Sequence, residues 1–321
     1  MILARKIEEI RKAKFFGERL KHTFKEAATY FLETNMHLAN ICEHARYIKQ
    51  LDPFIGHLPL EKIHIGTLQA YIDSRKKEGV KNKTINLGLQ TVRRILNLAA
   101  RLWRDESGLT WLEAPPLIQM LPLTDARKPY PISWEEQERL FKVLPTHLLR
   151  MCLFKVNTGL RTQEVCQLRW DWEVKMPELN TSVFLIPEEL VKNDEDRIVV
   201  LNHVAKSVID SVRGMHKERV FTYRSKPIGS MNNTAWQRAR EKVGLDQVRV
   251  HDLKHTCGRR LRSARVPLET RKVLLGHTNN DITSHYSAAE IQELIDAANK
   301  MCEAKSGKTP ALTLIRSLRT G

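Results

Sequence analysis

A proline-rich stretch between residues 105 and 131 is the sequence feature that most limits how this 321-residue chain can fold. Its segment EAPPLIQMLPLTDARKPYPIS carries five prolines and no sustained apolar period, and proline interrupts helices and sheet interiors. Directly after it, SWEE has the pattern of a capping box, with Ser133 as N-cap and Glu136 three residues on. The sequence therefore predicts a linker over 105–131 and a second domain that begins near residue 132.

Residues 21–104 are predicted to form a small helical domain. Thr23 is the expected N-cap of TFKEAATYFLE, in which apolar residues recur on one helical face. The same period continues through LANICEHARYIKQL, TLQAYIDSRKKEG and NKTINLGLQTVRRILNLAARLW. Four or five helices on short connections favour a bundle, and residues 1–20 are expected to be an N-terminal helix or arm.

Residues 132–301 are predicted to form a larger domain, mainly α with a small antiparallel β-sheet. HLLRMCLFKVNTG predicts an apolar helix closed by Gly159, and TQEVCQLRW begins another helix. The β-branched runs SVFLIP and DRIVVL flank the polar EELVKNDE, which is typical of a hairpin. Helical segments continue to residue 301, and residues 302–321 are expected to be a C-terminal tail.

The positive charge of the chain indicates a polyanionic partner. Lysine and arginine number 53 against 37 aspartates and glutamates, a formal net charge of +16, which is more than solubility requires. The first domain carries cations that are candidates for nucleic-acid contact, although a charge run is also typical of a solvated helix face. These candidates are Lys76, Lys81, Lys83, Arg93, Arg94 and Arg101.

Cysteine usage and hydropathy predict a cytoplasmic protein with no membrane segment. The five cysteines are scattered and never spaced as CxxC, so we expect reduced thiols and neither a disulfide framework nor a zinc knuckle. The N-terminal MILARKIEEIRKAKFF mixes charges into its apolar residues, unlike a signal peptide. No apolar run approaches the roughly 20 residues that span a bilayer.

The segment HDLKHT, residues 251–256, has two chemical interpretations, a metal site or a phosphate site. His251 and His255 are four residues apart, as in HExxH zinc hydrolases. However, Asp252 stands where those enzymes place their glutamate base, and Lys254 puts a cation between the two histidines. A lysine beside a dication is repelled by it, so a zinc site is disfavoured.

A nucleotide site is also disfavoured. SGKT at residues 306–309 resembles the end of a phosphate loop, but Cys302 stands where a Walker motif needs glycine. A polar tail is the simpler interpretation. The sequence therefore predicts neither a metal nor a nucleotide cofactor.

A phosphate site accounts for more of the candidate residues than a metal site or a nucleotide site does. Arg161 follows the glycine turn at Gly159, which would present a guanidinium at a helix start, with Glu164 three residues on to hold it. Taken singly, each candidate also has an ordinary structural interpretation, such as a surface arginine or a half-buried tyrosine. In chain order the candidates are Arg161, Glu164, Lys192, His251, Lys254, His277 and Tyr286.

In this order the residues resemble the tyrosine recombinase family, the phage-integrase type of site-specific DNA recombinase. The resemblance rests on TGLRTQEVCQLRW, VKNDEDRIVVL, HDLKHT and LLGHTNNDITSHY. It extends to the helical residues 21–104, which look like the core-binding domain of the family. It implies that residues 132–301 are an α+β catalytic domain.

The resemblance implies a role for each matched residue. Tyr286 would be the nucleophile, and Arg161 would clamp the scissile phosphate. Lys192 would protonate the leaving 5′-oxygen. His251 and His277 would hydrogen-bond the phosphate and assist proton transfer.

Two further positions support or qualify this picture. Glu164 matches the acidic position that supports the active site. Lys254 departs from the family pattern, which usually has a second arginine there. Because arginine offers a bidentate fork and lysine a flexible point charge, the departure predicts a slower enzyme more readily than an inactive one.

The implied activity is cleavage and rejoining of duplex DNA through a 3′-phosphotyrosyl intermediate, without metal or ATP. The implied partners are double-stranded attachment sites, a homotetramer on paired sites, and host DNA-bending or excision-directing factors. The tail would either dock on a neighbouring subunit or fray. Three alternatives remain: a recombinase-like protein that binds DNA without cleaving it, a type IB topoisomerase, and a zinc hydrolase that chelators would inhibit.

Overall fold

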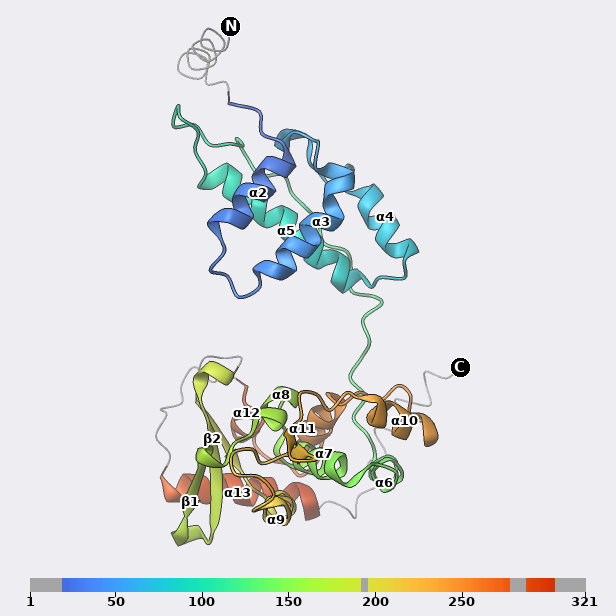
Figure 1. Ribbon diagram of the computed structural model, residues 1–321, viewed down its shortest axis with the longest axis vertical. Helices are drawn as coiled ribbons and strands as arrows, with labels where there is room; N and C mark the ends of the chain where they lie inside the picture. Colours follow the sequence, from blue (N-terminus) through green and yellow to red (C-terminus); the bar gives the residue numbers. More distant parts are fainter. Residues whose placement is uncertain (1–18, 192–195, 278–286, 304–321) are drawn as a thin grey trace, which may run out of the picture. The chain divides into compact units, whose positions relative to one another are not determined.

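The computed structural model describes residues 19–191, 196–277 and 287–303, and the chain divides into two compact units, Met1–Lys128 and Pro129–Gly321 (Figure 1). Each unit has its own hydrophobic core. The mainly helical fold with small antiparallel sheets that the sequence predicted is confirmed. No described helix is both long and apolar enough to cross a membrane.

The first unit is a bundle of amphipathic helices. Its first described helix begins where the sequence predicted, because Thr23 Oγ1 accepts from the Glu26 backbone N–H and Glu26 accepts from the Thr23 N–H in return. The long helix α5 buries one face, including Ile85, Leu89 and Val92, against the other helices. The described helices are α2 (Phe24–Thr34), α3 (Ile41–Ile55), α4 (Gln69–Lys77) and α5 (Asn82–Arg101).

Much of the proline-rich stretch packs on this unit. Leu112 and Ile118 are buried in the same core. The Asn86 side chain pairs with the backbone of Leu121 through two hydrogen bonds of 2.8 Å, and Asp125 accepts from the backbone N–H of Asn82 at 2.7 Å. Residues 105–125, inside the predicted linker, therefore contribute to the first unit.

The second unit places a small sheet beside a helical core. The predicted hairpin is present as β2 and β3, and β1, which the sequence did not indicate, adds a third antiparallel strand in the order β1-β2-β3. A second, two-stranded sheet pairs β4 with β5. The strands are β1 (Glu173–Met176), β2 (Thr181–Ile186), β3 (Arg197–Val200), β4 (Thr222–Tyr223) and β5 (Lys226–Pro227).

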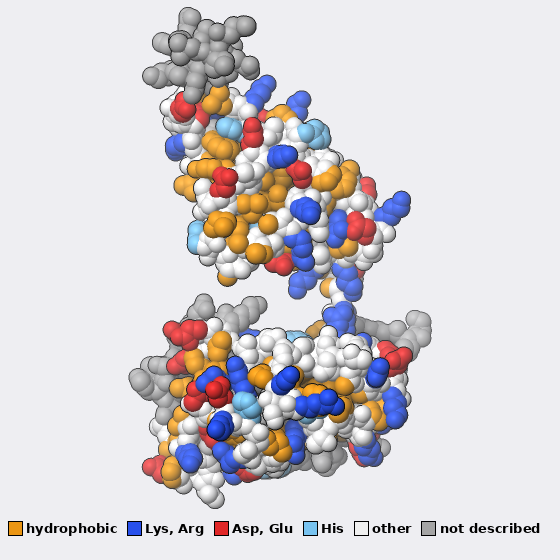
Figure 2. Space-filling view, in the orientation of Figure 1, with side chains coloured by type: hydrophobic (Ala, Val, Ile, Leu, Met, Phe, Trp, Pro, Cys, Tyr) orange, Lys and Arg blue, Asp and Glu red, His pale blue; other side chains and the backbone are white. Residues whose placement is uncertain are grey.

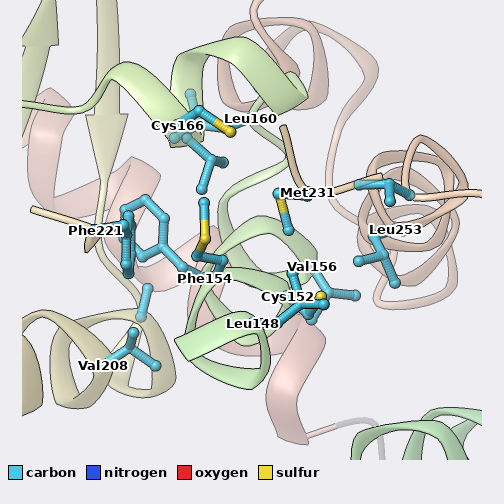
Figure 3. Close-up of a cluster of buried hydrophobic side chains, with 14 of the residues drawn as sticks. Leu148, Cys152, Phe154, Val156, Leu160, Cys166, Val208, Phe221, Met231 and Leu253 are labelled. Carbon is cyan, nitrogen blue, oxygen red and sulfur yellow. The ribbon is translucent and has the colours of Figure 1, made fainter. Parts of the chain in front are cut away.

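Several helices of this unit pack around α7. It is apolar on most faces and contacts α8, α9 and α11. Figure 3 shows Phe154 of α7, Leu160 of the following turn and Cys166 of α8 in one core. The helices are α6 (Trp134–Lys142), α7 (Thr146–Thr158), α8 (Thr162–Gln167), α9 (His203–Val212), α10 (Thr234–Lys242), α11 (Asp252–Ser263), α12 (Leu268–Leu275) and α13 (Ala288–Glu303).

Two hydrogen bonds join the start of the second unit to α11, beside a capping box at the start of α6. Ser133 and Glu136 form the predicted capping box at the start of α6. The backbone N–H of Tyr130 donates to Asp252 at 3.1 Å, and that of Ile132 donates to Thr256 at 3.0 Å. Asp252 also accepts from the backbone N–H of Arg249 at 2.8 Å. The Asp252 carboxylate therefore holds the backbone of Tyr130 next to the start of α11.

Candidate active site

The turn between α7 and α8 presents Arg161 as the sequence predicted. Gly159 closes α7 in the left-handed conformation, with φ of 66°, a region that glycine adopts without steric cost. The Arg161 backbone N–H donates to Glu164 at 2.6 Å, and its Nη1 donates to the same carboxylate at 2.7 Å. Glu164 therefore holds both the backbone and the guanidinium of Arg161.

A second glycine turn, at the end of α12, lies against the first. Gly276 closes α12 with φ of 58°, and the N–H groups of Gly276 and His277 donate to carbonyls of α12 at 2.9 Å. Arg161 Nη2 donates to the Gly276 carbonyl at 3.2 Å. The two turns thus bring Arg161 and His277, which are far apart in sequence, to one edge.

Two buried lysines lie beneath this edge. Lys254 of α11 is 7% exposed, and its Nζ donates to the Leu275 carbonyl. Lys155 of α7 is fully buried, and its Nζ donates to the Leu160 carbonyl at 2.5 Å. Each lysine therefore donates to a carbonyl beside one of the two glycine turns.

Arg197, the first residue of β3, completes the buried layer. It is 4% exposed and donates through Nη1 to Glu164. Its Nη2 lies 3.4 Å from the Gly159 carbonyl and 3.3 Å from that of Leu274. One guanidinium thus contacts both glycine turns and the carboxylate.

The electrostatics of this layer favour an anion. Burial, together with the charges of Arg197 and Arg161, lowers the pKa of Lys254 to about 6. Burial also lowers the pKa of Lys155 to about 8. Burial raises the pKa of Glu164, but its contacts with Arg197 and Arg161 outweigh that effect and lower it overall. The carboxylate is therefore ionised, and positive charge exceeds negative charge around it.

The two candidate histidines lie at the exposed edge. Partial burial and the charge of Lys155 lower the pKa of His251. Partial burial and the charges of Lys254, Arg161 and Arg197 lower the pKa of His277. Both rings are therefore neutral near pH 7.5, and a neutral imidazole donates one hydrogen bond and accepts another.

The structure brings together five of the seven predicted residues: Arg161, Glu164, His251, Lys254 and His277. Lys192 and Tyr286 lie outside the described residues. Ser287, the first described residue after them, caps α13, because its Oγ accepts from the Glu290 backbone N–H at 3.2 Å.

Sequence reasoning missed Lys155 and Arg197. The signal for the first is a lysine between apolar residues near the end of HLLRMCLFKVNTG, because a charge among buried residues needs a partner. Arg197 precedes the apolar residues of the run RIVV, and nothing in the local sequence indicates that it is buried.

Among the described residues, the segment HDLKHT does not belong to a set of side chains that could bind a metal ion. The rings of His251 and His255 are 4.9 Å apart and edge to face. Within the ranges that the structure describes, no group of three or more His, Cys, Asp or Glu side chains is placed to hold a metal ion.

The six candidate cations of the first unit are all exposed. Two of them have local contacts: Lys81 Nζ donates to the Asp125 carbonyl at 3.2 Å, and the Arg94 guanidinium lies 5.6 Å from the centre of the Phe31 ring. In Figure 2, lysine and arginine side chains are visible where α4 ends and α5 begins. Exposure leaves these cations available to a polyanion.

The family model and the similar known proteins all point to the same family. Residues 132–293 match the model described as the phage integrase family. The integrase of Salmonella phage P22 is 26% identical over 70% of this chain, and the chain spans 58% of that protein. Tyrosine recombinase XerA of Thermococcus kodakarensis is 26% identical over 70% of this chain and 77% of its own length.

A solved structure shares the fold. The lambda integrase tetramer bound to a Holliday junction superposes with a TM-score of 0.61 at 15% identity, covering 86% of this chain and 83% of that one. At this identity the likeness concerns the fold alone.

The buried amine of Lys254 predicts a pH-dependent stability difference. The pKa of Lys254 falls from 10.5 to about 6 on folding, so the unfolded chain binds the proton more tightly, and the resulting destabilisation grows as pH falls from 10.5 to 6. Lys254→Met should therefore be more stable than wild type by roughly 2–4 kcal/mol at pH 7, even after losing the bond to Leu275. Denaturant unfolding at pH 7 and pH 10 measures this difference, which should shrink at pH 10.

Lys206→Met is the matched control, because Lys206 is an exposed lysine paired with Asp210. Its stability difference from wild type should stay within about 0.5 kcal/mol at both pH values. A Lys254→Met variant that is less stable than wild type at pH 7 would contradict the assignment of Lys254 as a buried, weakly basic amine.

Proposed function

The chain belongs to the phage integrase family, and we propose that it is a site-specific tyrosine recombinase that cleaves and rejoins duplex DNA through a 3′-phosphotyrosyl intermediate. The observation that carries the proposal is the cation layer around Glu164, with Arg161 and His277 at its exposed edge. A phosphodiester in the transition state of attack concentrates negative charge on its oxygens. Fixed N–H donors and cations of this kind stabilise that charge.

Tyr286 is the proposed nucleophile. Its phenol oxygen forms the new bond to phosphorus, and the bond from phosphorus to the 5′-oxygen breaks. A phenol with a pKa near 10 needs a base, and the neutral rings of His251 and His277 can accept its proton. Lys192 gives a proton to the leaving 5′-oxygen, and the reverse sequence restores both groups on rejoining.

Lys254 makes phosphate binding a proton-linked event. In the free protein its pKa of about 6 leaves it largely uncharged at pH 7.5. A phosphate beside it would add the negative charge that favours the ammonium form. Binding of the scissile phosphate should therefore draw a proton onto Lys254, whereas an arginine at this position would already be charged.

The proposed DNA partner also engages the first unit. Lys83 and Arg101 lie near opposite ends of α5, about 27 Å apart at the rise of an α-helix. That separation matches about eight base pairs of duplex. Cations spread along α4 and α5 are suited to following a DNA backbone and do not form a compact site for a small anion.

The proposed assembly is a homotetramer on two paired attachment sites, acting in the cytoplasm on DNA in the nucleoid. Its support is the fold shared with a lambda integrase tetramer bound to a Holliday junction. Host DNA-bending or excision-directing factors are the proposed accessory partners. A recombinase-like protein that binds DNA with little or no cleavage is the second candidate, and Lys254 is the observation that favours it.

Covalent trapping tests the nucleophile. With plasmid carrying the attachment region, EDTA present and detergent to stop the reaction, wild type should leave protein bound to a DNA 3′ end. Tyr286→Phe should leave none, because it lacks the attacking oxygen, while its DNA affinity stays within about twofold. Tyr223→Phe is the matched control, because Tyr223 is an exposed tyrosine of β4, and its adduct should equal that of wild type.

Lys254→Arg should raise the rate of adduct formation roughly ten- to a hundred-fold, because the guanidinium adds a charge-assisted hydrogen bond to the phosphate. An adduct that persists in Tyr286→Phe would contradict the assigned nucleophile. Binding without an adduct in every variant, on each of a set of sequences, would favour the non-cleaving candidate. Cleavage without sequence preference would favour a topoisomerase.

Salt dependence tests the DNA surface of the first unit. If its six candidate cations each neutralise one phosphate, they contribute about −5 to the slope of log K against log salt concentration. Lys83→Gln and Arg101→Gln should each make the slope shallower by about 0.9, measured by fluorescence anisotropy on a duplex. Lys142→Gln, which removes an exposed α6 lysine paired with Glu138, should leave the slope unchanged. Equal slopes for all variants would remove this surface from the proposal.

A further inference from the structure

Arg197 joins the segments that form the candidate active site. From the start of β3, its guanidinium donates to Glu164 of α8, to the Gly159 carbonyl at the end of α7 and to the Leu274 carbonyl at the end of α12. Its side chain is only 3% exposed, so these contacts are made out of water. One rigid group therefore connects three separate segments of the chain.

The segments that Arg197 joins carry the proposed phosphate-binding residues. Glu164 holds Arg161 through two hydrogen bonds, and the turn after Leu274 ends at His277. Arg161 itself donates to the Gly276 carbonyl. Arg197 and Arg161 thus cross-link the same two turns, Arg197 from the buried side and Arg161 from the exposed side.

Gly276 leaves room for the Arg197 guanidinium. A Cβ atom at Gly276 would lie 2.6 Å from Cζ and 2.8 Å from Cδ of Arg197, which is closer than real Cβ contacts allow. The same residue has a positive φ of 58°, a conformation that side chains rarely adopt. Glycine is therefore required here both by the turn and by the close approach of Arg197.

Stability alone gives little reason for this arrangement. A buried ion pair is often no more stabilising than well-packed apolar residues of similar size, because desolvation offsets the attraction. What a guanidinium supplies is a planar fork that holds several acceptors in fixed geometry, whereas lysine is a flexible point charge. Lys254, which donates to the neighbouring Leu275 carbonyl, holds this turn through a single donor group.

We propose that Arg197 is a positioning residue of the recombinase site: it fixes Arg161 and His277 relative to each other and supplies the rigid fork that Lys254 lacks. This inference rests on the proposed function for its effect on cleavage. Its effect on the α12 turn is independent of that function.

The test compares Arg197→Lys with Arg213→Lys. Arg213, whose side chain is 47% exposed, makes a bidentate pair with Glu173 at 2.7 and 2.9 Å, so the control makes the same substitution outside the site. Single-turnover cleavage at saturating DNA should fall roughly ten- to a hundred-fold in Arg197→Lys, with the Kd for DNA within about twofold. Arg213→Lys should leave both unchanged.

Amide hydrogen exchange in the free protein gives the second readout. The N–H groups of Gly276 and His277, which donate to Val273 and Lys272, should exchange at least about tenfold faster in Arg197→Lys. Amides of α9 should keep their rates. If Arg197 only adds stability, all the protected amides accelerate together and cleavage at saturating DNA is unchanged, which overturns the proposal.

The proposal can still be tested if Arg197→Lys does not fold or if wild type does not cleave DNA. If Arg197→Lys does not fold, Glu164→Gln weakens the same contact from its other partner, and the same local exchange pattern is expected. If wild type itself forms no adduct on any DNA, the proposed function fails. The exchange rates of Gly276 and His277 still decide whether Arg197 holds the turn.

Discussion

The candidate site depends on the hydrogen bonds that the Glu164 carboxylate accepts from two arginines. This carboxylate accepts from the backbone and guanidinium of Arg161 and from Arg197, and so fixes the two arginines that join the glycine turns. One carboxylate does not balance the cations gathered around it, which include Arg161, Arg197 and Lys155 even while Lys254 is uncharged. The surplus of positive charge complements a phosphodiester, whose oxygens become more negative as it is attacked.

The fold makes this charge cluster rigid by attaching it to the ends of packed helices. Helices α7 and α12 both end in a left-handed glycine, and each end leaves backbone carbonyls without a helical partner. Lys155, Lys254 and Arg197 donate to carbonyls at or beside these ends. Lys254 and Arg197 therefore satisfy carbonyls at the helix termini with the same hydrogen bonds that build the anion site, and Lys155 does so at the carbonyl that follows the α7 cap.

Local patterns were readable from the sequence, and long-range burial was not. Capping boxes, the hairpin of β2 and β3, and the Arg161–Glu164 pair depend on residues a few positions apart, so composition and spacing predict them. Arg197 is buried by α8 and α12, and the proline-rich stretch packs through Leu112 and Ile118. Such contacts join residues distant in sequence, where no local period records them.

The most direct measurement is an NMR titration of Lys254 with labelled lysine, first in the free protein and then bound to a duplex carrying the attachment site, with Lys254→Arg used to assign the signal. The account predicts a midpoint at about pH 6 in the free protein and a rise of at least about one pH unit with DNA, because the phosphate stabilises the ammonium. A midpoint near 10.5 without DNA, or one that DNA leaves unchanged, would contradict a buried cation site that binds the scissile phosphate.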